Sequence, residues 1–378
     1  MQQATDLGVA RRLSRIMDDA GHIRVVAIDH PEPYQLLFDT DLNRVTFEEV
    51  AESKLRLVRG MATCATGLIL DPVTSLAPAI ATGYLPGNVG LISGVEDFYF
   101  DPTISDLRSS LSVRQGWEPP KLASLGVDVV KLVVYSRHDD PARDVHLRFV
   151  QSVAHQCHTL HLPIIVEPIW LHGPDEDPMD PAVRALRMES TIDSSDAFRS
   201  AGADVMKLEF PWQLLTEGDE ALAHEACARI TTATNGPWVI LSAGVTFAEF
   251  ASQLRIAAAN GACGYMAGRA IWADAVGRIG QDSLERGTAT AVRRLSELNE
   301  IMAAAPSSRE RTSVSSALAA YGPRWFMHAC DTDHVANGSS EPGSTLPSRP
   351  GSSPSRPRVR PPLPALLVRH GRTGRGWP

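Results

Sequence analysis

The chain has 378 residues, a length that fits one α/β barrel and does not require two domains. Apolar residues make up 43% and charged residues 21%, so there is enough apolar material for a packed core. The net charge of −8 argues against a nucleic-acid partner for the main body, although a few local arginines could still hold a small anion.

The N-terminal stretch, MQQATDLGVARRLSRIMDDAGH, lacks the apolar segment of a signal peptide, and no later stretch approaches 18 uncharged apolar residues. The five cysteines are scattered and form no C-x-x-C pair, which argues against both a disulfide framework and a thiolate metal site. We therefore expect a cytoplasmic protein with no membrane partner.

Eight short apolar runs, rich in valine and isoleucine, follow one another along the chain with amphipathic segments between them. The runs are 23–28, 67–71, 89–95, 127–134, 163–167, 203–210, 237–243 and 262–268. Nearly continuous apolar character is typical of parallel strands that are buried on both faces. Segments such as 47–62, 142–158 and 288–304 have the pattern of the intervening helices.

Eight strands alternating with helices predict an α/β fold, a (β/α)8 TIM barrel, over residues 1–305. A doubly wound open sheet is the structural alternative, but no G-x-G-x-x-G motif follows the first run. From residue 306 onward Pro, Gly, Ser and Arg dominate, so we expect 306–378 to be a disordered tail without a part in the active site. Residues 331–378 carry a net charge of +4, which leaves −12 for residues 1–330.

Polar residues stand at or near the carboxyl ends of the predicted strands, where barrel enzymes place their chemistry. They are Asp29, Asp71, Lys131, Glu167, Lys207 and Glu209. Only four of the 36 basic residues are lysines, and two of these four lie inside apolar runs. Because strand side chains alternate between faces, Lys131 should share a face with Val129, and Lys207 with Val205 and Glu209.

Two buried lysines on strands that flank Glu167 suggest amine chemistry. A nucleophilic lysine needs its pKa lowered from about 10.4 to about 7 to 8, and burial and a second cation both lower it. One of the two lysines could then form a Schiff base with a carbonyl, while Glu167 and Asp29 move protons. A structural lysine–glutamate pair at the barrel mouth is the alternative.

The loops after the seventh and eighth runs, ILSAGVT and GYMAGRAIW, each offer a glycine close to a helix start. In barrels of this kind these loops commonly hold a phosphate with backbone N–H groups. Arg269 could add a charge-assisted contact to the same anion.

The segments VVKLVVYS, IIVEP, ADVMKLEFP, PWVILSAGV and GYMAGRAIW, within about Val25 to Trp272, resemble the class I tagatose 1,6-bisphosphate aldolase and sulfofructose-phosphate aldolase family, an aldolase-type TIM barrel. The resemblance implies that Lys207 is the Schiff-base lysine, Glu167 the general acid and base, and Lys131 a cation that stabilises oxygen charge and lowers the pKa of Lys207. It implies that Asp29 orients substrate hydroxyls. Its anion-binding residues fall on Ser242, Gly244, Gly268 and Arg269.

The resemblance also implies a lyase that reversibly cleaves a ketose phosphate, tagatose-1,6-bisphosphate-like or sulfofructose-phosphate-like, to dihydroxyacetone phosphate and an aldehyde, with no metal and no cofactor. Two departures concern the second phosphate. After Asp29 the sequence reads His30-Pro31-Glu32-Pro33 where the family usually has Gln or Arg. The loop GVEDFYFDPT after the third run is acidic where bisphosphate aldolases tend to carry a lysine.

Other functions remain open at this point. His155, His158 and His161 have metal-like spacing, but they precede the fifth strand at the opposite end of the barrel, so we expect them on an exposed helix face. A non-catalytic barrel that binds sugar phosphate and a deoxyribose-phosphate-type aldolase are the alternatives to the predicted activity. The expected partner is a small-molecule sugar phosphate, and a homo-oligomer is possible by fold analogy.

Overall fold

The structure is a computed structural model that describes residues 6–30, 32–97, 111–170, 173, 175–216, 218–276, 281–308, 313–321, 323 and 325. The chain divides into two units, Met1–Arg311 and Thr312–Pro378. The predicted boundary at residue 305 precedes this division by a few residues. Most of the predicted tail lies outside the described residues, and its described part includes one short helix, α12 (Val314–Ala320).

The first unit is a closed parallel barrel whose strands pair in chain order, β1 to β8, with β8 returning to β1. The strands are β1 (Ile23–Ala27), β2 (Gly67–Ile69), β3 (Gly90–Gly94), β4 (Val129–Tyr135), β5 (Ile164–Ile169), β6 (Val205–Leu208), β7 (Trp238–Ile240) and β8 (Gly264–Ala267). Each lies within or overlaps one of the eight predicted runs. The predicted (β/α)8 barrel is therefore confirmed, and the open sheet is excluded.

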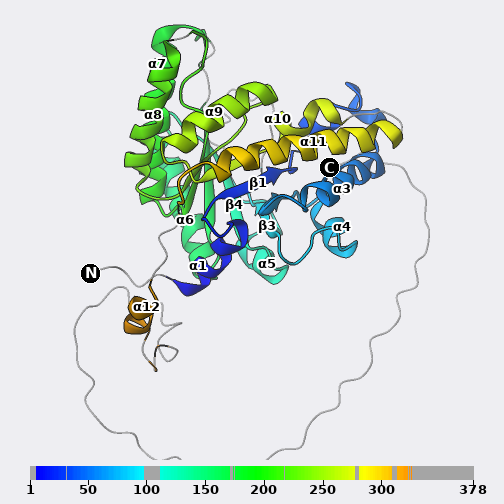
Figure 1. Ribbon diagram of the computed structural model, residues 1–378, viewed down its shortest axis with the longest axis horizontal. Coiled ribbons are helices and arrows are strands. Elements are labelled where there is room, and N and C mark those ends of the chain that lie inside the picture. Colours follow the sequence, from blue (N-terminus) through cyan, green and yellow to red (C-terminus); the bar gives the residue numbers. More distant parts are fainter. Residues whose placement is uncertain are drawn as a thin grey trace, which may run out of the picture. The chain divides into compact units, whose positions relative to one another are not determined.

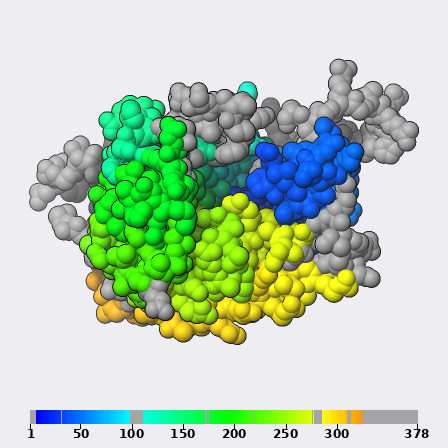
Figure 2. Space-filling model, turned by 90° about the horizontal axis from the view of Figure 1, so that it is seen from above, coloured from blue at the N-terminus to red at the C-terminus, as the bar shows by residue number. Residues whose placement is uncertain are grey.

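Helices follow the strands and cover the outside of the barrel (Figure 1). They are α2 (Glu32–Gln35), α3 (Phe47–Met61), α4 (Leu76–Ala81), α5 (Pro119–Ser124), α6 (Arg143–His158), α7 (Pro181–Ser200), α8 (Asp219–Thr234), α9 (Phe247–Ala259), α10 (Arg269–Trp272) and α11 (Gln281–Ala303), and one further helix, α1 (Leu7–Leu13), precedes β1. Seen from above in Figure 2, the colours run around the barrel from blue through green to yellow, as the strand order requires. No helix in the described part of the chain is long and apolar enough to cross a membrane.

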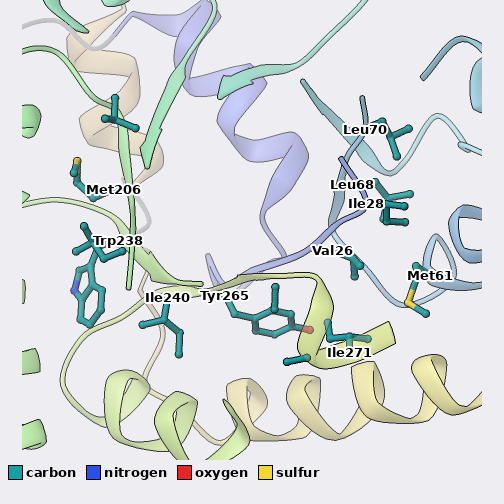
Figure 3. Packing of buried hydrophobic residues seen from close by; sticks show 14 of the residues in the cluster. Val26, Ile28, Met61, Leu68, Leu70, Met206, Trp238, Ile240, Tyr265 and Ile271 are labelled. Atoms are coloured by element: carbon teal, nitrogen blue, oxygen red, sulfur yellow. The ribbon is translucent and has the colours of Figure 1, made fainter. Parts of the chain in front are cut away.

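Buried apolar side chains form two clusters, one on each face of the strands. The larger cluster lies between the barrel and its helices and includes Val26, Leu68, Ile240 and Tyr265 (Figure 3). The smaller cluster fills the barrel interior; it includes Ala27, Val129, Ile165 and Val205 from the strands, and Ile16 from the 3-10 helix Ser14–Ile16 that precedes β1. Successive strand residues thus alternate between the two clusters, as the pleat of a strand requires.

The segment after α11 is tied back to the residues that precede β1. The Nε2 atom of His22 lies 3.0 Å from the carbonyl oxygen of Pro306, and the Ser307 hydroxyl donates to the carbonyl oxygen of Ala20 at 2.9 Å. The Ser308 hydroxyl donates to the carbonyl oxygen of Gly21 at 2.8 Å. These bonds place residues 306–308 against the barrel.

Candidate active site

Four predicted site residues stand two positions beyond a side chain of the barrel interior. Asp29 follows Ala27, Lys131 follows Val129, Glu167 follows Ile165 and Lys207 follows Val205. Because the period of a strand is two, each pair shares one face, and the four polar groups converge at the carboxyl end of the barrel interior.

Lys131 is the centre of this cluster and is surrounded by carboxylates. Its Nζ atom donates to Asp29 Oδ2 at 2.6 Å and lies 3.3 Å from Glu96 Oε1 and 3.6 Å from Glu167 Oε2. Its side chain is 7% exposed, so these contacts replace most of its hydration. A buried ammonium with such partners is held in its charged form.

Lys207 makes a separate contact with the same glutamate. Its Nζ atom donates to Glu167 Oε2 at 2.8 Å, and its side chain is 5% exposed. One carboxylate oxygen of Glu167 therefore faces both ammonium groups. The sequence-based expectation that Glu167 lies between the two lysines agrees with this geometry.

The charges within the cluster shift the pKa values of its members. Burial alone would raise the pKa of Asp29, but the charge of Lys131, with His30 and Lys207, outweighs burial and holds that pKa well below its ordinary value. Burial would likewise raise the pKa of Glu167, and the two lysines together hold it below the usual range. Burial would lower the pKa of Lys131, but Asp29, Glu96 and Glu167 raise it well above the ordinary value. A lysine held charged in this way is a poor nucleophile.

His30, which follows Asp29, is an uncharged member of the site near neutral pH. Burial and the charge of Arg269 lower its pKa to about 4, against the opposing effect of Asp29. Its ring meets Trp272 edge-on, with ring centroids 5.5 Å apart. Its Nδ1 atom is buried and has no hydrogen-bond partner among the described residues.

The predicted anion-binding residues occupy the loops after β7 and β8. A Cβ atom on Gly244 would lie 3.4 Å from the Arg269 guanidinium carbon, so these two loops meet, and the Arg269 side chain is exposed. Gly268 packs so closely on β1 that a Cβ there would lie 2.6 Å from the Ala27 carbonyl oxygen. Ser242 is buried two residues beyond β7. Ser242, Gly244, Gly268 and Arg269 thus follow two neighbouring strands at the carboxyl end of the barrel.

The contacts of two residues in this region were not predicted from the sequence. Glu96 was seen only as part of an acidic loop, yet it contacts Lys131; residues 98–103 of that loop, and Pro31, lie outside the described residues. Lys54 is a third buried lysine, in α3, and its Nζ atom bonds to Asp71 Oδ2 at 2.8 Å. The sequence pattern around each residue did not predict these two contacts, because each contact joins different elements of the chain.

Strand alternation predicted that Glu209 shares a face with Lys207, but Glu209 contacts Trp170 and Arg187. Its carboxylate accepts hydrogen bonds from the backbone N–H of Trp170 at 2.9 Å and from Arg187 at 3.1 Å. The residue lies just beyond the end of β6, so the alternation of the strand no longer applies to it. It fixes the segment after β5 to α7.

The three histidines with metal-like spacing have different surroundings. His155 is exposed on α6, as expected. His158 Nε2 lies 2.9 Å from Asp204 Oδ2, and His161 Nδ1 lies 2.8 Å from Asp6 Oδ2. Within the described ranges no group of three or more His, Cys, Asp or Glu side chains has the geometry of a metal site.

The closed eight-stranded parallel barrel is a TIM-barrel fold. Residues 87–274, which include the strands that carry Lys131, Glu167 and Lys207, match the model of the DeoC/LacD family aldolase. The predicted resemblance is thereby confirmed.

A curated relative matches most of the chain, and solved structures share its fold. Tagatose 1,6-diphosphate aldolase 1 of Enterococcus faecalis is 25% identical over 311 residues, which cover 77% of this chain and 94% of that protein. Fructose-bisphosphate aldolase of Plasmodium falciparum superposes with a TM-score of 0.59 at 14% identity, over 82% of this chain and 98% of that one. A Schiff-base-forming fructose-1,6-bisphosphate aldolase gives a TM-score of 0.50 at 18% identity, over 75% and 98% of the two chains. At these identities the two structures show the shared fold alone.

Proposed function

We propose that the protein is a class I aldolase that cleaves a ketose phosphate reversibly to dihydroxyacetone phosphate and an aldehyde, with Lys207 as the Schiff-base residue. The observation that carries this proposal is that the two buried lysines differ in the number of carboxylates around them. Lys131 is fixed as a charged group by Asp29, Glu96 and Glu167, whereas Lys207 forms one ion pair with a described carboxylate, that of Glu167.

The contact between Lys207 and Glu167 supplies two reagents at once. Transfer of one proton along this 2.8 Å hydrogen bond leaves a neutral amine on Lys207 and a carboxylic acid on Glu167. The amine adds to the substrate ketone, and the acid returns its proton to the carbinolamine oxygen, which departs as water. The product is a protonated imine on Lys207.

Cleavage follows from the same pair of residues. Glu167, again a carboxylate, removes the proton of the hydroxyl group that becomes the aldehyde, and the electrons of the broken carbon–carbon bond pass into the imine. Protonation of the resulting enamine and hydrolysis release dihydroxyacetone phosphate. The protonated imine is the electron sink, so this route does not call for a metal ion.

Other residues of the site bind the substrate in this proposal. The Lys131 ammonium stabilises negative charge on substrate oxygens, and Asp29 accepts hydrogen bonds from substrate hydroxyls. Ser242, Gly244, Gly268 and Arg269 hold the phosphate at the β7 and β8 loops. Because Asp29 and Glu96 place carboxylates toward β1 and β3, we expect hydroxyl groups rather than a second phosphate at that end of the substrate.

Borohydride trapping tests the proposal. Reduction in the presence of dihydroxyacetone phosphate should add one triose phosphate to the peptide that contains Lys207, and Lys207→Met should abolish the adduct. Lys121→Met is the matched control, because this lysine is exposed on α5 and should leave the adduct unchanged.

Three results would overturn the assignment. The first is an adduct absent from the Lys207 peptide of the folded protein, which would favour a barrel that binds sugar phosphate without turnover. The second is loss of activity in chelator without any trapped adduct, which would indicate a metal-dependent aldolase. Cleavage or condensation with an aldehyde donor in place of dihydroxyacetone phosphate would indicate deoxyribose-phosphate-type chemistry.

A further inference from the structure

Lys54 is fully buried in α3, outside the cluster that carries the proposed chemistry. Its Nζ atom donates to the backbone carbonyl oxygen of His30 at 3.0 Å and to Asp71 Oδ2 at 2.8 Å, and it lies 5.0 Å from the centre of the Tyr34 ring. A buried ammonium is costly unless such partners replace its hydration. All three contacts are to the segments that follow β1 and β2.

Asp71 is itself held firmly where it receives this bond. Its carboxylate accepts bonds from the backbone N–H of Val73 at 2.9 Å, from the Thr74 hydroxyl at 2.8 Å and from the Ser75 hydroxyl at 2.7 Å. The carboxylate therefore stays fixed at the exit of β2. Through the Lys54 ammonium, this fixed point is joined to the backbone at the exit of β1.

The backbone that Lys54 holds belongs to the site. His30 directly follows Asp29, whose carboxylate bonds to Lys131 at 2.6 Å. On its other side this segment is bounded by Trp272, which packs against the rings of His30 and Tyr34 and donates from Nε1 to the Ala27 carbonyl oxygen at 3.0 Å. The exit of β1 is thus clamped between α3 and α10, with one charged hydrogen bond on the α3 side.

We propose that Lys54 is a positioning residue of the active site, whose ammonium fixes the Asp29–His30 backbone and so sets the place of the Asp29 carboxylate beside Lys131. The inference rests on the proposed aldolase function, because it concerns how Asp29 meets the substrate. Lys54 reaches Asp29 only through the backbone. Misplacement of a reacting group by about 1 Å can lower a rate about 100-fold, so a backbone anchor of this kind has a measurable effect.

The test is Lys54→Met, which keeps the length of the side chain and removes the donor. Turnover of the ketose phosphate should fall about 10- to 100-fold. Borohydride trapping of dihydroxyacetone phosphate on Lys207 should persist, because Lys207 is held by Glu167 on β5 and not by the β1 exit. A variant that had lost its fold would lose both signals, so retention of trapping with loss of turnover marks a positioning role.

A double-mutant cycle with Asp29→Asn asks whether Lys54 acts through Asp29. If it does, the double variant should be no slower than Asp29→Asn alone. Additive losses, or wild-type turnover in Lys54→Met, would overturn the proposal. If Lys54→Met does not fold, Lys54→Met combined with Asp71→Asn removes the buried charge left behind and permits the same measurements.

Val153→Ala controls for stability alone. Val153 is buried on α6, and its truncation weakens the core without touching the β1 exit. It should leave turnover per folded molecule unchanged; an equal loss of turnover in this variant would overturn the proposal. Failure of the wild-type protein to trap an adduct would instead refute the proposed function, which separates that result from a failure of the Lys54 inference alone.

Discussion

At the scale of single residues, the most informative atom of the site is Glu167 Oε2, which lies 2.8 Å from Lys207 and 3.6 Å from Lys131. In the proposed reaction, Glu167 exchanges a proton with Lys207 while the Lys131 cation stabilises the charged form of the glutamate. Lys131 thus keeps Glu167 a carboxylate at rest, and the proposal requires substrate binding to change this balance so that Lys207 acts as a neutral amine.

Glu167→Gln should lower kcat about 10²- to 10⁴-fold, since the amide can neither accept nor return the proton. Steady-state cleavage assays measure the effect. Glu220→Gln, at an exposed glutamate on α8, serves as the control and should behave as wild type. Near wild-type turnover in Glu167→Gln would show that another group transfers the proton.

Asp29 also makes stability depend on pH. The folded pKa of Asp29 is depressed below its unfolded value near 3.8, so its contribution to stability is present above that pH and is lost as the pH falls through the folded pKa. Asp29→Asn, which leaves Lys131 without its shortest bond, should cost about 3 to 5 kcal/mol at pH 6. Urea unfolding from pH 6 to pH 3 should show this difference shrinking below about pH 4. A constant difference over that range would contradict the linkage.

The residues that sequence reasoning placed correctly share one property. Lys131, Glu167 and Lys207 lie within strands, so their side-chain direction follows from parity, and Asp29 keeps the same parity two residues beyond β1. Glu96 likewise lies two residues beyond its strand, and its contact with Lys131 joins two elements that local periodicity does not relate. Lys54 is buried because α3 packs its ammonium against Asp71, a contact between elements that local periodicity does not encode.

At the scale of elements, the apolar runs predicted the presence of all eight strands but not the residue at which each strand ends. The run 203–210 contains β6, which stops at Leu208, because Glu209 turns to bond Trp170 and Arg187. The short helices α2, α4 and α10 were not predicted individually. They have four to six residues, too few for a helical period to appear in the sequence.

Closure of the barrel between β8 and β1 requires a glycine at position 264. A Cβ atom on Gly264 would lie 1.9 Å from the carbonyl oxygen of Ile23, its partner on β1. Gly264→Ala should therefore force the two strands apart and lower the free energy of unfolding by about 3 kcal/mol or more. Gly87→Ala is the control, because nothing lies within 4 Å of a Cβ there. Equal unfolding midpoints in urea for the two variants would contradict this account of the closure.

At the scale of the whole molecule, charge and geometry act in opposite directions on the substrate. Residues 1–330 carry a formal charge of −12, so their overall field repels a sugar phosphate. The proposed phosphate site must therefore rely on groups close to the anion, namely Arg269 and the backbone of the β7 and β8 loops. Binding should tolerate salt better than binding steered by a basic surface, because short-range contacts are screened less.

The segment after α11 decides where the stable barrel unit ends. We expect a chain of residues 1–311 to match the full chain in unfolding free energy and turnover, because it keeps the bonds of residues 306–308 to Ala20, Gly21 and His22. A chain of residues 1–305 loses these bonds and the Ser308 N–H bond to the Ala20 carbonyl oxygen, and should be less stable by about 2 to 4 kcal/mol. Urea unfolding of the three chains measures both differences. Equal stability of 1–305 and 1–311 would mean that the barrel ends with α11, whereas a destabilised 1–311 would mean that residues beyond Arg311 support it.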